Sequence, residues 1–145
     1  MITIDLSTLV DRSPQDIFDF LSNPLNLTKW QQMIAHIEQV TPGAVGVGSK
    51  YKVAAELLGR KIDGLMEITT FAPPDKFGFT NQAGPMHVTV TVTLKPVGTG
   101  AKIALHAEGN PAGFFKIAEG MLAGQVKSQM EANLARLKSV LESDS

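Results

Sequence analysis

One stretch near the carboxyl end, residues 114–141, is the only segment long and periodic enough to form a major helix. Its apolar residues recur at steps of three and four, which at about 100° per residue makes one stripe along a helix. The stripe comprises Phe114, Ala118, Met121, Leu122, Val126, Met130, Leu134, Leu137 and Leu141. Such a stripe has to be buried, so the preceding residues are expected to supply the apolar surface that covers it.

Two glycines one turn apart, Gly120 and Gly124, interrupt this helix, and each costs a helix interior about 1 kcal/mol relative to alanine. The stripe also changes direction there, by roughly a quarter-turn or more. Two explanations stay open, namely close packing against the sheet or space left for a ligand. In the second, Gly120 and Gly124 form a hinge between a movable first half of the helix, which acts as a gate, and a fixed second half.

The residues before the helix show the period of two that is typical of strands. The clearest case is residues 86–95, where Met, Val and Leu alternate without a break with His, Thr and Lys. Turn residues separate the other predicted strands, at residues 2–7, 35–40, 50–57, 61–71, 76–82 and 101–108. Ser13-Pro14 and Asn23-Pro24 are helix-start signals, so two short helices, the second over residues 25–30, are expected after the first strand.

This order of elements predicts an α+β architecture in a single domain, residues 1–145. The terminal helix is the only element long enough to cover the apolar face of the sheet. A twisted sheet of this size curls, and its face does not match a helix everywhere. We therefore expect a cavity between the sheet and the helix.

Composition excludes several functions. A net charge of -1 with 19% charged residues is that of an ordinary globular protein, and the basic residues are not clustered, so no nucleic-acid binding is expected. The absence of cysteine excludes disulfides, thiolate nucleophiles and Cys-ligated zinc. No apolar run reaches membrane-spanning length and no signal sequence is recognisable, so we expect no membrane insertion and a cytoplasmic location. The oligomeric state, a homodimer included, stays open.

Several sequence blocks resemble a known family over nearly the whole chain. They are residues 13–24, Trp30, Gly46-Val47-Gly48, Leu58-Gly59, Phe71-Ala72-Pro73-Pro74 and the helix at 114–141. Their order and spacing resemble the SRPBCC or START-like helix-grip superfamily, in its polyketide cyclase/dehydrase-like branch. The resemblance implies a curved seven-stranded antiparallel sheet around the terminal helix, with a pocket for lipids, sterols, polyketides or other bulky apolar ligands. It does not imply one activity, so function is argued from the site.

Catalytic and metal-binding patterns are scarce. His87 and His106 share strand faces with polar residues and should face solvent, and no HxxxH or HExxH spacing is present, so neither a metal nor a cofactor is expected. Strand parity leaves the face of His36 open. Glu56 and Glu67 fit a solvated face. Asp63 faces inward only if a β-bulge shifts the strand register.

Inward parity and side-chain size predict a set of pocket residues. The set comprises Trp30, Tyr51, Val53, Met66, Phe77, Phe79, Asn81, Met86, Val90, Phe114 and Met121. Tyr51 and Asn81 differ from the others because a buried hydroxyl or amide needs a partner, which is protein, water or ligand.

Three functions are compatible with these patterns. The first is noncatalytic binding of a hydrophobic small molecule in the cavity. The second is an aromatase/cyclase-like or dehydratase-like enzyme in which Tyr51, Asn81 or an inward Asp63 acts as proton donor, proton acceptor or oxyanion partner. The third is an interaction module without a ligand, which a filled core would support.

Overall fold

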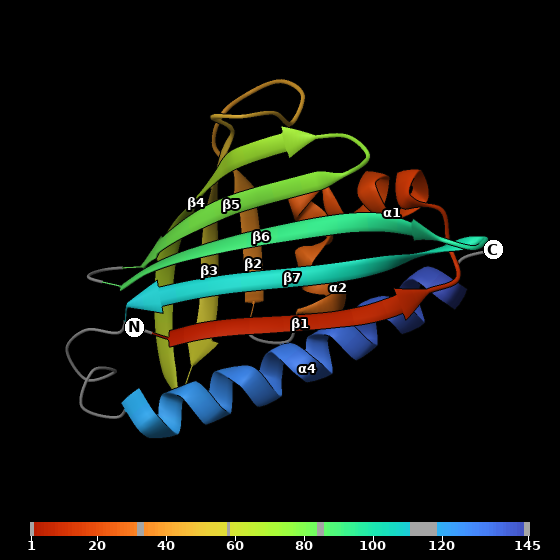
Figure 1. The fold of residues 1–145 in the computed structure, drawn as a ribbon. Coiled ribbons are helices and arrows are strands. Elements are labelled where there is room, and N and C mark those ends of the chain that lie inside the picture. Colours follow the sequence, from red (N-terminus) through yellow and green to blue (C-terminus); the bar gives the residue numbers. More distant parts are fainter. Residues whose placement is uncertain (1, 32–33, 58, 84–85, 111–118, 144–145) are drawn as a thin grey trace.

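The computed structural model describes residues 2–31, 34–57, 59–83, 86–110 and 119–143 (Figure 1). The side chains at 57, 60, 83, 86, 110 and 119–123 lie outside this description. In chain order the elements are β1 (Ile2–Val10), α1 (Pro14–Leu21), the 3-10 helix η1 (Pro24–Asn26), α2 (Leu27–Trp30), β2 (Ile34–Gln39), β3 (Lys50–Leu57), β4 (Arg60–Ala72), β5 (Lys76–Ala83), β6 (Met86–Val97), β7 (Gly100–Asn110) and α4 (Glu119–Ser143).

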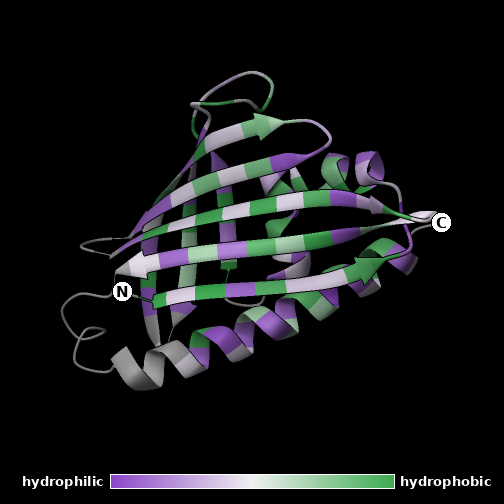
Figure 2. Ribbon diagram, viewed as in Figure 1, coloured by the Kyte–Doolittle hydropathy of each residue, from purple (hydrophilic) through white to green (hydrophobic). Residues whose placement is uncertain are grey.

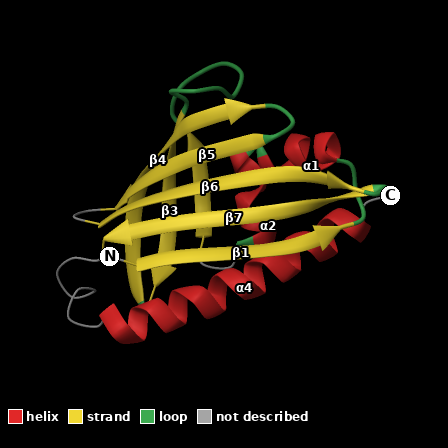
Figure 3. Ribbon diagram, in the orientation of Figure 1, coloured by secondary structure: helices red, strands yellow, loops and turns green. Residues whose placement is uncertain are grey.

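The seven strands form one antiparallel sheet in the order β1-β7-β6-β5-β4-β3-β2. The chain thus runs strand by strand from β2 to β7, and β1 closes the far edge by pairing with β7. The sheet is curved, and α4 lies along it, packed against β1 and α2 (Figure 3). The predicted α+β helix-grip architecture is confirmed. Among the described helices, none combines the length and the apolar character needed to cross a membrane.

The alternation along β6 shows how the sequence sets the two faces of the sheet. Val90, Val92 and Leu94 are buried on the concave face, whereas the threonines between them are only half-buried on the outer face. The same alternation of hydrophobic and hydrophilic residues recurs along the neighbouring strands in Figure 2. Burial of the concave side chains fixes the strand register, because a slip of one residue would expose all of them.

The two helix-start signals act as predicted, with one difference. The Ser13 hydroxyl accepts a hydrogen bond from the Asp16 N–H at 3.1 Å, which caps α1. The Asn23 carboxamide oxygen accepts from the Leu25 N–H at 3.2 Å and starts a 3-10 turn. The predicted single helix at 25–30 is therefore wrong in detail, since η1 comes first and α2 follows from Leu27.

The carboxyl end of α4 is fastened to the end of β1. The Lys138 ammonium donates to the Leu9 carbonyl at 2.6 Å, and the Arg12 guanidinium donates to the Leu141 carbonyl at 2.8 Å. Glu142 accepts from the Asp11 N–H at 3.0 Å, and this hydrogen bond lowers the pKa of its carboxyl group. The predicted start of the helix at Phe114 lies outside the described residues.

Gly124→Ala is expected to raise the free energy of unfolding by up to about 1 kcal/mol through helix propensity. Gly124 is exposed, and a Cβ built on it would meet no heavy atom within 4 Å. Close packing therefore does not explain this glycine, and alanine should not clash. Denaturant unfolding of the variant measures the change, and a fall in stability would contradict the expectation.

At Gly124 the structure leaves only one of the two arguments for the hinge hypothesis, namely that glycine weakens the helix. Because Gly124 does not line the cavity described below, alanine would fill no ligand space there. A drop in ligand affinity in Gly124→Ala would then report a stiffer helix rather than a smaller cavity. The surroundings of Gly120 lie outside the described residues.

His106 lies on the outer face of the sheet between two carboxylates. Its Nδ1 is 2.5 Å from the Asp5 Oδ1, and its Nε2 is 2.9 Å from the Glu108 Oε1. These hydrogen bonds, that to Asp5 first, raise the pKa of His106 above 6.5. As sequence parity predicted, His87 faces solvent; so does His36, whose face the sequence left open.

A raised histidine pKa makes stability depend on pH. The stabilisation is fully present below pH of about 6.5 and is lost as the pH rises through the higher pKa of the folded state. We expect His106→Gln to flatten the pH dependence of Tm in this window, and an NMR titration of wild-type His106 to give a midpoint above 6.5. His87→Gln, which leaves the Asp5–His106–Glu108 contacts intact, is the control. An unchanged slope in His106→Gln would refute the assignment.

Candidate functional site: a cavity between the sheet and two helices

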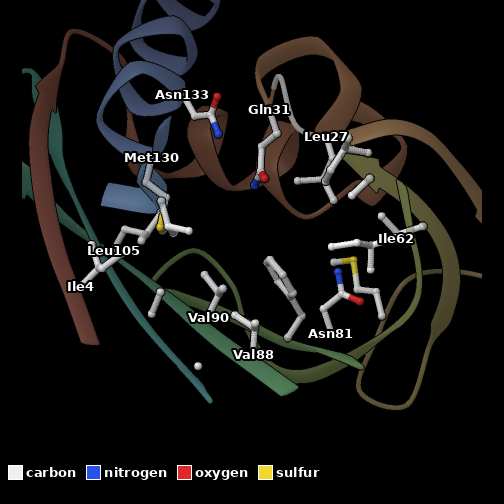
Figure 4. Close-up of a pocket in the computed structure, with 18 of the residues that line it drawn as sticks. Ile4, Leu27, Gln31, Ile62, Asn81, Val88, Val90, Leu105, Met130 and Asn133 are labelled. Atoms are coloured by element: carbon white, nitrogen blue, oxygen red, sulfur yellow. The ribbon is translucent and has the colours of Figure 1, made fainter. Parts of the chain in front are cut away.

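A cavity of about 200 Å³ lies between the concave face of the sheet and the helices α2 and α4 (Figure 4). Every strand contributes to its wall, and most of the contributing side chains are aliphatic or aromatic. The third predicted function, a module with a filled core, is therefore not supported. The lining residues from the sheet are Ile2, Ile4, Ile34, Val53, Ala55, Glu56, Ile62, Met66, Phe79, Asn81, Val88, Val90, Leu105, Ala107, Glu108 and Gly109.

The helical wall comes from two elements. Leu27 and Trp30 belong to α2, and Gln31 follows immediately after it. Val126, Met130 and Asn133 come from α4. Trp30, the only tryptophan of the chain, is almost fully buried, so its side chain reports directly on the interior of the cavity.

Six of the predicted pocket residues line the cavity: Trp30, Val53, Met66, Phe79, Asn81 and Val90. Tyr51 and Phe77 also point inward, but both are buried in the core and do not line it. The Phe77 ring packs edge-to-face against Phe18, with ring centroids 6.2 Å apart. Phe114 and the side chains at Met86 and Met121 lie outside the described residues. Ligand binding by the six residues stays a prediction.

The three candidate catalytic residues do not come together. Asp63 is exposed, because β3 and β4 pair without a register shift at Ala54 and Asp63. The bulge in β4 lies instead between Ile68 and Thr70, in its pairing with β5. The condition for an inward Asp63, a bulge that shifts the register at this residue, is therefore not met. Burial raises the pKa of the Tyr51 hydroxyl, which stays protonated in the core, and only Asn81 faces the cavity.

The carboxamide of Asn81 is an unusual feature of the cavity wall. Its Oδ1 is buried and has no hydrogen bond partner among the residues that the structure describes. A buried acceptor left unsatisfied costs roughly 1 to 3 kcal/mol. Native structures rarely retain such a group without a reason, and a ligand that supplies the missing donor is one such reason.

Sequence reasoning missed the polar residues on the helical side. Asn133 is 2% exposed, and its Oδ1 accepts a hydrogen bond from the Gln129 carboxamide at 3.3 Å. A signal was present, since Asn133 follows Met130 by three residues and precedes Leu137 by four, which places it within the apolar stripe. The predicted stripe contains apolar residues alone and therefore does not include this position.

The second half of α4 does not act only as an anchor, contrary to the hinge hypothesis. Val126 and Met130 line the cavity. Leu134, Leu137 and Leu141 are buried in the core and hold the helix. Within the described part of α4, the change from cavity wall to anchor therefore falls after Met130, and the hinge at Gly120 and Gly124 stays a prediction.

Charged residues are scarce on the described wall. Glu56 and Glu108 border the cavity and are exposed, and the Glu108 carboxylate lies on the outer face of the sheet, 2.9 Å from the His106 Nε2. No lysine or arginine is among the described lining residues. Across the part of the chain that the structure describes, no three His, Asp or Glu side chains gather to hold a metal ion.

Comparisons with known proteins agree with this geometry. A protein of Mycobacterium tuberculosis, described as uncharacterised, is 26% identical over 135 residues, which cover 92% of this chain and 94% of that protein. The crystal structure of TTHA0849 from Thermus thermophilus superimposes with a TM-score of 0.84 at 15% identity, over 99% of both chains. That of CV1439 from Chromobacterium violaceum gives 0.75 at 22% identity, over 97% of both chains.

These solved structures establish the fold, which is that of helix-grip proteins. The sequence profile of one family, described as "Polyketide cyclase / dehydrase and lipid transport", matches residues 1–142. Together with the curved sheet, the long terminal helix and the apolar cavity between them, this match over nearly the whole length shows that the chain belongs to the polyketide cyclase/dehydrase and lipid transport family.

Proposed function

We propose that the protein binds a small hydrophobic molecule in the cavity between the sheet and α4, without chemical conversion. The observation that carries the proposal is the cavity itself, about 200 Å³ in volume and walled mainly by aliphatic and aromatic side chains. Few polar groups on an otherwise apolar wall are typical of small-molecule sites, where they orient the ligand. The family includes lipid transport proteins, which supports this reading.

The expected affinity follows from the buried area. A guest that buries roughly 200 to 300 Å² of apolar surface gains about 5 to 8 kcal/mol at about 25 cal/mol per Å², before the cost of association. This corresponds to micromolar binding at best. The function would then be reversible carriage or sensing rather than tight storage.

The enzymatic alternative needs a proton donor and a proton acceptor beside the guest. Among Tyr51, Asn81 and Asp63, only Asn81 lines the cavity, and an amide is not a proton-transfer group near neutral pH. No arrangement among the described residues therefore favours the cyclase or dehydratase alternative over binding.

A screen of fatty acids, flavonoids and polyketide-like aromatics tests the proposal. A ligand at 100 times its Kd should stabilise the fold by about 2.7 kcal/mol, which a thermal shift detects. Because Trp30 is the only tryptophan and lines the cavity, a change in its fluorescence on titration locates binding at this site. If no compound shifts Tm, displaces a hydrophobic dye or changes the Trp30 signal, the proposal fails.

A further inference from the structure

The polar groups that face the cavity are few and mostly uncharged. The described wall contains three carboxamides, Gln31, Asn81 and Asn133. Figure 4 shows Gln31 and Asn81 on opposite walls, each directed toward the interior. A ligand inside the cavity therefore meets amides on both sides and, among the described residues, no cation.

Asn81 and Asn133 differ in the hydrogen bonding of their carboxamide oxygens. The Oδ1 of Asn133 accepts a hydrogen bond from Gln129, one helical turn away. In the described part of the chain, the Oδ1 of Asn81 is buried and meets no hydrogen bond donor. Asn81 is thus the group whose hydrogen bonding a ligand can complete.

A hydroxyl group fits this requirement best. It donates its proton to the Asn81 Oδ1, and its oxygen can accept from an amide N–H, so it suits either orientation of the carboxamide. A carboxylate only accepts, and it would lose its hydration without meeting a cation.

We propose, building on the binding function above, that the cavity selects an uncharged, hydroxyl-bearing apolar molecule over fatty acids and other anions, with Asn81 as the residue that recognises the hydroxyl group. The volume sets the size of the guest. About 200 Å³ exceeds the roughly 150 Å³ that accommodates a benzene, and lies below the roughly 300 to 1,000 Å³ of drug-sized sites. The ligand, or the part of it that enters, therefore has one or two rings or the equivalent aliphatic volume.

Three two-ring compounds of nearly equal shape test the selection: naphthalene, 2-naphthol and 2-naphthoate. At pH 7 the phenol is uncharged and the carboxylate is ionised. Calorimetric titration of the wild-type protein should show 2-naphthol binding about fivefold to tenfold tighter than naphthalene, the value of one net hydrogen bond. The naphthoate should bind at least about tenfold more weakly than 2-naphthol.

Asn81→Leu removes the amide at similar volume. The ratio of the affinities for 2-naphthol and naphthalene should fall toward one in this variant. Thr80→Val, on the neighbouring outward position of β5, is the matched control and should keep the wild-type ratio. Asn81→Ser provides a second test at the same position. The comparison of the three compounds in the wild-type protein does not depend on whether a variant folds.

The outcomes separate the two proposals. If naphthalene binds but the naphthoate equals or exceeds 2-naphthol, the selection for a hydroxyl group is overturned and the binding function stands. An unchanged ratio in Asn81→Leu overturns the role of Asn81 in the same way. If none of the three compounds binds, the selection and the size of the guest inferred here are overturned, and the screen described above decides the binding function.

Discussion

Replacing Leu137 by alanine is expected to lower the free energy of unfolding by about 2 to 5 kcal/mol. Leu137 is 1% exposed and lies in the segment of α4 that packs on the sheet, between the buried Leu134 and Leu141. Truncation leaves a void that a helix fastened at its end to β1 cannot easily close. Chemical denaturation of the variant, fitted with a common m-value, measures the loss.

Met130→Ala is the matched control on the same helix. Met130 is only partly buried and already borders the cavity, so its side chain has fewer packing partners to lose. We expect a smaller loss of stability than in Leu137→Ala, together with a larger cavity that admits bulkier guests. If Met130→Ala costs as much as Leu137→Ala, the division of α4 into a cavity wall and an anchor is wrong.

The fold was predictable because its signals are local and redundant. The alternation along β6 determines which side chains face inward without reference to any other strand. The proline-containing cap at Ser13 likewise determines the start of α1 by a single hydrogen bond. The long apolar stripe of the terminal helix then has one partner large enough to cover it. Each of these arguments needs only the residues within one element.

The site was predictable where parity alone decides, as for Asn81 in β5. It was not predictable where the pairing between two strands decides which way a side chain faces. The register shift that would have turned Asp63 inward occurs elsewhere in β4, between Ile68 and Thr70, since bulges depend on the match between two strands. Glu108 borders the cavity although its side chain lies on the outer face beside His106. Parity correctly gives its face but carries no information on whether the residue borders the cavity.

The hydrogen bonding within the cavity likewise could not be predicted from the sequence. Both Asn81 and Asn133 are inward amides, and the sequence does not distinguish them. In the folded chain Gln129 lies one turn before Asn133 and donates to its Oδ1, whereas no described neighbour donates to the Oδ1 of Asn81. The proposed selection of a ligand hydroxyl depends on this difference. The difference arises only when the strands and helices come together to form the cavity wall.

Val90→Phe is expected to reduce ligand affinity by about tenfold to 100-fold while the protein stays folded. Val90 lies in the middle of β6, and its side chain points into the cavity (Figure 4). The larger ring would occupy part of the 200 Å³ and deprive the guest of roughly 60 to 110 Å² of contact, or about 1.5 to 3 kcal/mol. Titration followed by Trp30 fluorescence measures the loss.

Two controls separate blocking of the cavity from damage to the fold. Thr91→Phe places the same ring on the outer face one residue along β6, and it should leave affinity within about twofold of wild type. The stability of apo Val90→Phe should change little or rise, because the ring fills empty space instead of displacing packed atoms. Undiminished binding in a folded Val90→Phe would mean that the guest sits outside this cavity, since a ring at this position and the guest compete for the same volume.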